Sequence, residues 1–254
     1  MTTMSPSRPK PAGWMNEVRP IALTLGLVLI AETALAQPFI VPSGSMEPTL
    51  LVGDEIAANK FAYGYSKFSS PVGLMPDFAG RILGRAAERG DIVVFRLPRD
   101  PSQTYVKRVI GLPGDRIQMI QGQLLINGKV VPRRAIGHAG AESNGRPWSG
   151  TKYVETLPNG RTHEILKVSD QAPLNTTPEF VVPPDNYFMM GDNRDNSLDS
   201  RVPAAEGGVG FVPAENLVGR AQVVLFSINP LGQWAQVLAR PSELRISRLF
   251  EPVK

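Results

Sequence analysis

Breaks in regular secondary structure recur along the whole chain, because 24 glycines and 24 prolines are spread over its 254 residues. Proline interrupts a helix and glycine weakens one, so this spacing disfavours a bundle of long helices. Short runs rich in Val, Ile and Phe lie between the breaks, and several follow or precede a Gly-Asp pair. Such runs, bounded by turn residues, are typical of strands. We therefore expect a mainly β fold.

The clearest expected strands lie in the middle of the chain and near its end. They are residues 91–96, 104–110, 117–120, 123–126, 129–131, 187–190 and 222–228. The dipeptide Asn127-Gly128 is a strong signal for the tight turn of a β-hairpin. Between Pro132 and Pro184 the chain is polar and rich in breaks, and its weak strand candidates are 153–156, 163–168 and 179–182. We expect residues 117–187 to form a β-rich subdomain with long loops.

One long apolar stretch, Ile21 to Ala36, follows a polar tail, residues 1–20, that carries three basic side chains. As a helix this stretch measures roughly 24 Å, and a short continuation brings it near the ~30 Å of a hydrocarbon core. We therefore expect a transmembrane helix over residues 21–38. Because basic residues flank its N-terminal side, the tail is expected in the cytoplasm and residues 39–254 on the outer face.

A competing interpretation of this stretch is a cleaved signal peptide. Ala34-Leu35-Ala36 precedes Gln37 and has the small-x-small form of a cleavage site. A chain that began at Gln37 would lack the anchor. We favour the retained helix, and self-cleavage after Ala36 stays open.

Few side chains are available for the common catalytic chemistries. Cysteine is absent, which excludes thiolate nucleophiles, cysteine zinc sites and disulfides. The two histidines, His138 and His163, give little support to a Ser-His-Asp triad or a multi-histidine metal site. The net charge of +4 is too small to indicate nucleic-acid binding. We expect no metal or cofactor, and any serine nucleophile must use another base.

Two serines stand shortly after the apolar stretch, in the run Pro42-Ser43-Gly44-Ser45-Met46-Glu47-Pro48. Serine is a poor nucleophile unless a base lies within hydrogen-bond reach, and in this chain that base must be a lysine or a carboxylate. Lys107 is the natural candidate, because it sits in an apolar strand where burial disfavours its ammonium form. Lowering its pKa from about 10.4 to about 8 costs roughly 3 kcal/mol, which buried lysines tolerate.

A dense polar segment extends from Gly191 to Arg201, and Leu198 is its only large apolar residue. A hydroxyl such as that of Ser197 could orient the lysine. Asp199, paired with Arg201 or with Arg194, could hold the segment in one conformation. Taken alone, each of the three segments is also compatible with an ordinary turn or a solvated strand.

Together and in this order, the three segments resemble those of bacterial type I signal peptidase, also called leader peptidase, a family of Ser-Lys dyad serine peptidases. The resemblance covers the anchor and residues 39 to about 226. It implies a mainly β, signal-peptidase-like barrel or antiparallel-sheet catalytic domain with one N-terminal transmembrane helix. It also implies a serine endopeptidase of the bacterial inner membrane that removes signal peptides from exported preproteins, after small-x-small sites, on the periplasmic face.

The resemblance assigns roles to four hydroxyl and amine groups. Ser45 corresponds to the nucleophile and Lys107 to the general base. Ser197 corresponds to the hydroxyl that positions the lysine. Ser43 corresponds to the side-chain donor to the oxyanion, acting together with the backbone N–H of Ser45.

Asp199 and Arg201 correspond to a structural ion pair of the family. In the family, shallow apolar pockets admit only small side chains of the substrate. The residues at the positions that line these pockets are Phe39, Val41, Met46, Leu50 and Val106. No cofactor or metal is implied, and the expected partners are preprotein signal peptides, membrane lipid and the nearby secretion translocon. Two segments depart from the family pattern: 202–209, which is longer than usual, and 136–178, which follows no pattern.

Three other functions compete with this interpretation. A dedicated Ser-Lys processing peptidase of one secretion or conjugation system would refuse generic preproteins. An anchored β-domain that only binds envelope partners would make Ser45 and Lys107 incidental. A cytosolic self-cleaving repressor is disfavoured by the apolar stretch and by the lack of a recognisable N-terminal DNA-binding module.

Overall fold

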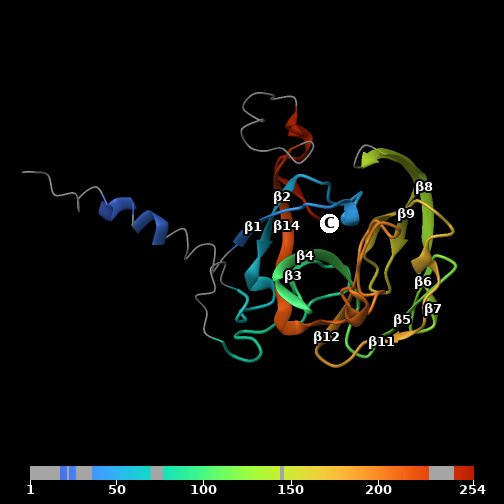
Figure 1. Ribbon diagram of the computed structural model, residues 1–254, viewed down its shortest axis with the longest axis horizontal. Coiled ribbons are helices and arrows are strands. Elements are labelled where there is room, and N and C mark those ends of the chain that lie inside the picture. The colour runs from blue at the N-terminus through green and yellow to red at the C-terminus, as the bar shows by residue number, and fades with distance from the viewer. Residues whose placement is uncertain (1–17, 22, 27–35, 70–76, 144–145, 229–242) are drawn as a thin grey trace, which may run out of the picture.

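The computed structural model describes residues 18–21, 23–26, 36–69, 77–143, 146–228 and 243–254. Within these ranges the fold is almost entirely antiparallel β structure, divided among sheets of eight, three and four strands (Figure 1). The expectation of a mainly β, antiparallel fold is confirmed. Short 3₁₀ turns connect the strands: η1 (Gly44–Met46), η2 (Lys60–Ala62), η3 (Pro173–Asn175), η4 (Ala204–Glu206), η5 (Ala214–Asn216) and η7 (Ile246–Arg248).

The eight-stranded sheet brings together the first and the last strands of the described residues. Its strand order is β1 (Ala36–Ile40), β2 (Asp54–Asn59), β14 (Leu217–Ser227), β3 (Ile92–Leu97), β4 (Asp100–Gly111), β12 (Asn186–Met190) and β13 (Val212–Pro213), with β15 (Glu251–Pro252) also paired to β14. The late strand β14 lies between the early strands β2 and β3. The order follows from long-range pairing, which no local sequence signal predicts.

Strand β3 divides the interior of this sheet into two cores. Its odd residues Val93, Phe95 and Leu97 pack into one buried cluster, whereas Ile92 and Val94 pack into the other. A strand buried on both faces reads as a continuous apolar run rather than an alternating one. The run at 91–96 was therefore easy to predict, and it supports the neighbouring strand β4 on one side.

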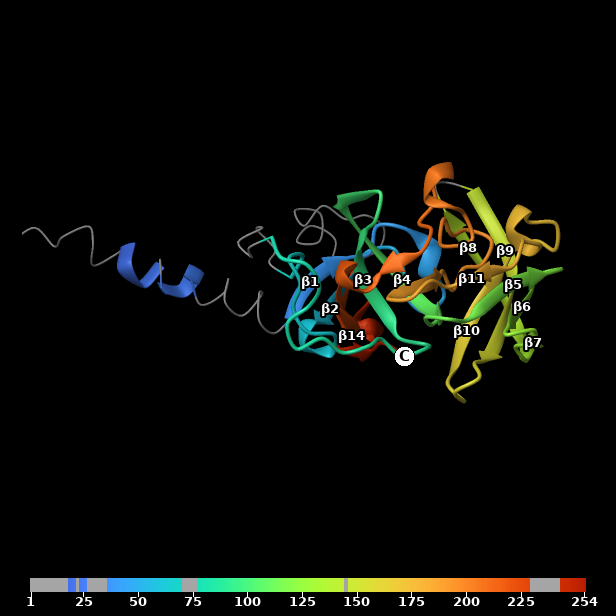
Figure 2. The same cartoon turned by 90° about the horizontal axis from the view of Figure 1, so that it is seen from below.

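Two smaller sheets form the end of the molecule remote from β1, as Figures 1 and 2 both show. One has the order β10 (Thr162–Lys167), β9 (Arg146–Thr156) and β8 (Arg133–Ser143). The other has the order β11 (Phe180–Val181), β5 (Arg116–Ile120), β6 (Gln123–Ile126) and β7 (Lys129–Val130). The hairpin turn at Asn127-Gly128 is present, and both of its residues have positive φ, 54° and 73°.

The long hairpin of β8 and β9 corrects the expectation of long loops after residue 132. Within residues 133–156, only 153–156 was expected to form a strand. Residues 134–138 of β8 are all exposed, so their side chains need not alternate between polar and apolar. The pairing relies on backbone hydrogen bonds, and the hydrophobic pattern that reveals other strands is missing. β1 and β2 were also not predicted.

The membrane segment lies mostly outside the described residues. Short helical turns occur at residues 18–21 and 23–26. In the described ranges, no helix is both long enough and apolar enough to cross a membrane. The expected span also ends too late, because β1 begins at Ala36 rather than after residue 38.

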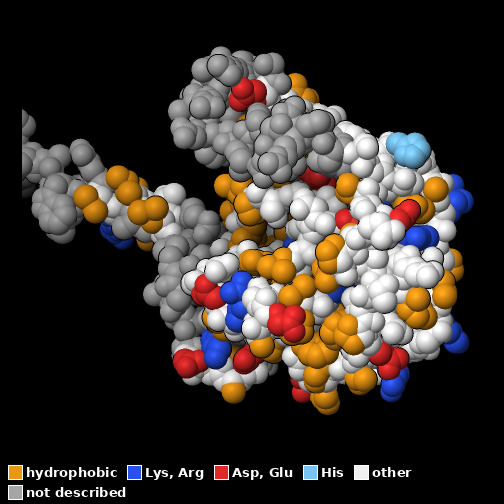
Figure 3. Space-filling model, turned by 45° about the vertical axis from the view of Figure 1, so that its right-hand side comes forward, with side chains coloured by type: hydrophobic (Ala, Val, Ile, Leu, Met, Phe, Trp, Pro, Cys, Tyr) orange, Lys and Arg blue, Asp and Glu red, His pale blue; other side chains and the backbone are white. Residues whose placement is uncertain are grey.

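Charged and apolar side chains are mixed over the described part of the face in Figure 3. Basic and acidic groups alternate there, and no large block of one charge stands out. Such a surface agrees with the small net charge of +4.

Candidate active site

Ser45 lies on the turn η1, which follows directly from the edge strand β1. Prolines at 42 and 48 prevent a longer helix, and the side chain of Met46 is fully buried beneath the turn. The backbone that follows the turn is fixed by a hydrogen bond, in which the N–H of Leu50 donates to the Met46 carbonyl over 2.9 Å. The Ser45 hydroxyl is therefore presented by a rigid turn whose own backbone is anchored in the core.

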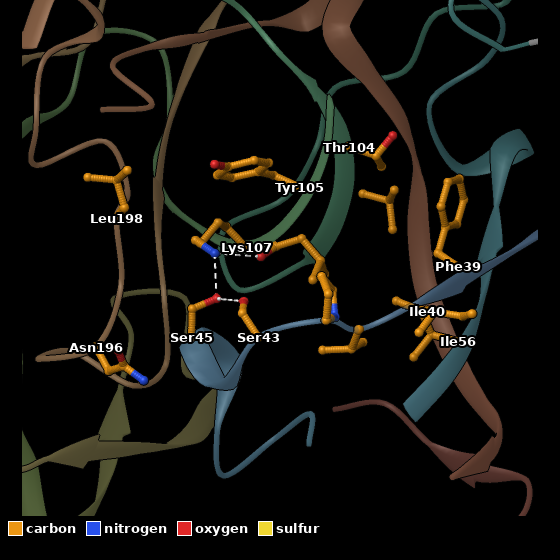
Figure 4. A pocket seen from close by; sticks show the side chains of 14 residues that line it. Phe39, Ile40, Ser43, Ser45, Ile56, Thr104, Tyr105, Lys107, Asn196 and Leu198 are labelled. Carbon is orange, nitrogen blue, oxygen red and sulfur yellow. Dashed lines mark hydrogen bonds between the residues drawn. The ribbon is translucent and has the colours of Figure 1, made fainter. Parts of the chain in front are cut away.

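Lys107 reaches Ser45 from strand β4, sixty-two positions later in the chain. The Nζ atom of Lys107 lies 2.6 Å from Oγ of Ser45 and 3.0 Å from the carbonyl oxygen of Val106 (Figure 4). A base must lie within about 2.6–3.2 Å of the hydroxyl whose proton it takes. The structure thus brings together the two groups that the sequence predicted as nucleophile and base.

The environment of Lys107 favours its neutral form. The residue is only 4% exposed, and burial is the main reason why its pKa falls from 10.5 to about 8. The carboxylates of Asp199 and Asp192 oppose this fall, and Arg201 adds to it. At a pKa near 8, a substantial fraction of the amine is unprotonated at mildly alkaline pH, so it can accept a proton.

Ser43 faces the same pocket as the dyad. Its Oγ lies 3.3 Å from Oγ of Ser45, and Figure 4 shows both hydroxyls below the amine of Lys107. A hydroxyl in this place can rotate toward the oxygen of a substrate carbonyl whose carbon Ser45 has attacked. The geometry is compatible with the expected role of Ser43 as an oxyanion donor.

The polar segment 191–201 folds into a buried loop beside the nucleophile. Asp199 accepts the N–H of Gly191 over 3.0 Å and forms an ion pair with Arg201 at 2.8 Å. Burial alone would raise the pKa of Asp199, but Arg201 and the hydrogen bonds to its carboxylate together outweigh burial, and the pKa is lowered. The expected pair of Asp199 and Arg201 is present, whereas Arg194 pairs with Glu155 of β9.

Ser197 lies next to the dyad but is separated from it by Gly191. A Cβ atom at Gly191 would sit 2.3 Å from Oγ of Ser197 and 2.4 Å from the carbonyl oxygen of Ser45, so the close packing requires glycine. Within the described residues, no direct hydrogen bond joins Ser197 to Lys107. The expected positioning role of Ser197 stays a prediction.

A buried ion pair joins this loop to β4 and to the nucleophile turn. Arg108 donates Nε and Nη2 to the two carboxylate oxygens of Asp192, over 2.8 and 2.7 Å. Thr49 donates its hydroxyl to the same carboxylate over 2.5 Å, and Asn193 donates its N–H to the carbonyl of Ser45 over 3.1 Å. Three separate chain segments are therefore held in one arrangement around the dyad.

The dyad lies in a cavity of about 400 Å³ that opens between β1, β4 and the loop. Its lining comprises Phe39, Ile40, Val41, Pro42, Ser43, Ser45, Ile56, Val94, Thr104, Tyr105, Val106, Lys107, Asn196 and Leu198. Three expected pocket residues, Phe39, Val41 and Val106, belong to this lining. Met46 and Leu50, also expected there, are fully buried in the core behind it.

Several lining residues were not predicted from the sequence. Thr104 and Tyr105 precede Lys107 on the same strand, so their neighbourhood in the chain could have indicated them. Tyr105 also places its ring 5.5 Å from the Lys107 amine. Asn196 and Leu198 belong to the polar segment, but only the fold reveals which of its side chains face the cavity.

Comparisons with known proteins agree on one family. A family model described as signal peptidase, peptidase S26, matches residues 14–226. The signal peptidase I of Rickettsia typhi is 40% identical, over 93% of this chain and 92% of its own length. The signal peptidase I of Rickettsia canadensis is 44% identical, over 84% of this chain and 80% of its own length.

One solved structure is similar over part of the chain. The signal peptidase I of Enterococcus faecalis V583 is 26% identical and covers 54% of this chain and 97% of its own, with a TM-score of 0.30.

Proposed function

Because the chain belongs to the S26 family of signal peptidases, we propose that Ser45 is its nucleophile and Lys107 its general base. The chain is a serine endopeptidase that cleaves signal peptides. The observation that carries the assignment is the 2.6 Å contact between Nζ of Lys107 and Oγ of Ser45, made by an amine whose pKa is lowered to about 8.

Acylation starts from neutral Lys107, which takes the proton of the Ser45 hydroxyl. The serine oxygen then attacks the scissile carbonyl, and the carbonyl oxygen becomes an oxyanion. The Ser43 hydroxyl and the Ser45 N–H stabilise that oxyanion by donating hydrogen bonds. When the intermediate collapses, the ammonium of Lys107 returns its proton to the leaving amine, and the signal peptide stays bound to Ser45 as an ester.

Deacylation repeats the same proton transfers with water. Neutral Lys107 takes a proton from a water molecule, which attacks the ester carbonyl. The second oxyanion accepts hydrogen bonds from the same donors as the first. Its collapse releases the signal peptide as a carboxylic acid and returns the proton to Ser45. Apart from the substrate and this water, the groups named in both halves of the reaction belong to the chain.

The preprotein is expected to bind as an extended strand between β1 and β4. In the described sheet, β1 pairs only with β2, and β4 pairs only with β3 before Arg108. Both strands thus offer a free edge toward the cavity. Val41 and Val106 stand in its wall, where they leave room only for small side chains at the first and third positions before the cut.

The location of the enzyme is also part of the proposal. Members of this family are generally membrane-anchored, and the basic residues before Ile21 favour a cytoplasmic N-terminus. The anchor would end before β1, with the peptidase domain and its 117–187 subdomain on the periplasmic face of the inner membrane. Lipid and the secretion translocon would then be neighbours of the site.

Cleavage of a generic preprotein tests the assignment directly. Detergent-purified enzyme is incubated with a preprotein that carries a small-x-small site, beside the Ser45→Ala and Lys107→Ala variants. We expect a new N-terminus directly after that site with the unaltered enzyme alone. Full activity in either folded variant would contradict the assignment, and cutting of one special substrate only would favour a dedicated processing peptidase.

A further inference from the structure

The loop 191–201 exposes only two of its side chains, Asn196 and Leu198, and both line the cavity of the dyad. An exposed leucine on its own needs no explanation. Here, however, it is the only large apolar residue of a polar loop, and its side chain is 45% exposed at the wall of the catalytic cavity. The reaction steps described above give Leu198 no role.

The backbone that carries Leu198 is held on both sides. Ser197 points inward and is buried, and Asp199 is fixed by its pair with Arg201. Earlier in the loop, the Asp195 carboxylate accepts the N–H groups of Val168 and Ser169, over 2.8 and 2.9 Å. The position of Leu198 is thus set by its neighbours, and its own side chain is left free to contact a ligand.

The side of the cavity on which Leu198 lies identifies what it can contact. Figure 4 places Leu198 and Asn196 on one side of the dyad, with Phe39 and Ile40 on the opposite side. The signal peptide is expected along β1, next to Phe39, and its last residue is bonded to Ser45 in the ester. The polypeptide on the Leu198 side of Ser45 must then be the part of the preprotein that follows the cut and leaves after acylation.

We propose that Leu198, facing the ring of Tyr105 across the cavity, forms a subsite for the side chain that follows the cut and favours an apolar side chain there. The inference rests on the proposed function, because it takes Ser45 as the point of cleavage. Leu198 has no group that can move a proton or donate a hydrogen bond. Its side chain therefore acts by apolar contact alone, and a substrate with glycine after the cut should depend on it less than one with leucine.

The test uses peptides with one small-x-small site that differ only in the residue after the cut. We expect the unaltered enzyme to favour leucine over glycine in kcat/KM by about three- to tenfold, because the contact is half exposed. Leu198→Ala should reduce that ratio to within about twofold, chiefly by slowing cleavage of the leucine peptide. Leu249→Ala is the matched control, since Leu249 is 46% exposed and does not line the cavity.

Two further variants give a gain that partial unfolding cannot produce. Leu198→Lys should favour an aspartate after the cut over a lysine by a few-fold, and Leu198→Glu should show the reverse preference. An unchanged leucine-to-glycine ratio in Leu198→Ala, with no charge preference in the other two variants, would overturn the subsite. Failure of the unaltered enzyme to cut any of these peptides would instead overturn the proposed function.

Discussion

Replacing Lys107 by methionine should stabilise the folded protein at neutral pH while removing its activity. Folding lowers the pKa of this amine from 10.5 to about 8. Below pH 8 the folded protein therefore carries a buried ammonium group. At 1.36 kcal/mol per pH unit, that difference corresponds to a penalty of about 3 kcal/mol. Methionine has similar length, is apolar and carries no such penalty.

The hydrogen bonds of the lysine offset part of this gain. Its amine contacts the Ser45 hydroxyl and the Val106 carbonyl, and each such bond contributes about 1 kcal/mol. The variant should therefore be more stable by about 1 kcal/mol at pH 7.

The pH dependence of this difference is a sharper test than its size. Between the folded pKa of about 8 and the unfolded value near 10.4, the unfolded chain binds more protons at residue 107, so the stability of the unaltered protein rises with pH. The methionine variant has no titrating group at this position, so its stability shows no such rise. The stability difference should thus move by about 3 kcal/mol in favour of lysine across this window.

Urea unfolding of both proteins at pH 7, 8, 9 and 10.5 measures the shift. The exposed Lys129→Met of strand β7 is the matched control for loss of one positive charge. A difference between the Lys107 variant and the unaltered protein that stays constant over the whole range would refute the claim that burial depresses this amine.

Three further substitutions test the parts that surround the dyad. Ser43→Ala should lower kcat by about 10²- to 10³-fold with little change in KM, because its hydroxyl acts on the oxyanion; a rise in KM at constant kcat would show that it only binds substrate. Gly191→Ala should abolish most cleavage and lower Tm, because its methyl group would overlap Ser197 at 2.3 Å; a near-normal enzyme would mean that the loop has room. Arg201→Leu leaves the carboxylate of Asp199 buried and unpaired, and urea unfolding should reveal a loss of about 3–5 kcal/mol. A loss below 1 kcal/mol would show that this pair is unimportant for stability.

The central strands of the fold could be predicted because their burial is visible in the sequence. β3 and β6 consist mostly of apolar residues and are flanked by turn residues, so the local pattern agrees with the final structure. The β8–β9 hairpin could not be predicted, because its exposed residues carry no pattern. The pairing of β14 with β2 joins distant parts of the chain, and no local signal reports it.

The site divides in a similar way. Chemistry limited the base for Ser45 to a lysine or a carboxylate, since histidine is scarce and cysteine absent. The apolar strand around Lys107 and the resemblance to a family supplied the rest. The pair of Arg194 with Glu155 could not be foreseen, because it depends on how β9 packs against the loop. Met46 and Leu50 lie near the nucleophile in sequence, but whether such apolar residues face a cavity or a core is decided by the fold.

The pH dependence of cleavage tests the central claim most directly, which is that a neutral buried lysine is the base for Ser45. The measurement is kcat/KM for one small-x-small peptide from pH 5 to 10, with detergent-purified, unaltered enzyme. We predict a rise through an apparent pKa of about 8, the value that burial gives to Lys107. A profile that stays flat from pH 5 to 9 would contradict the account.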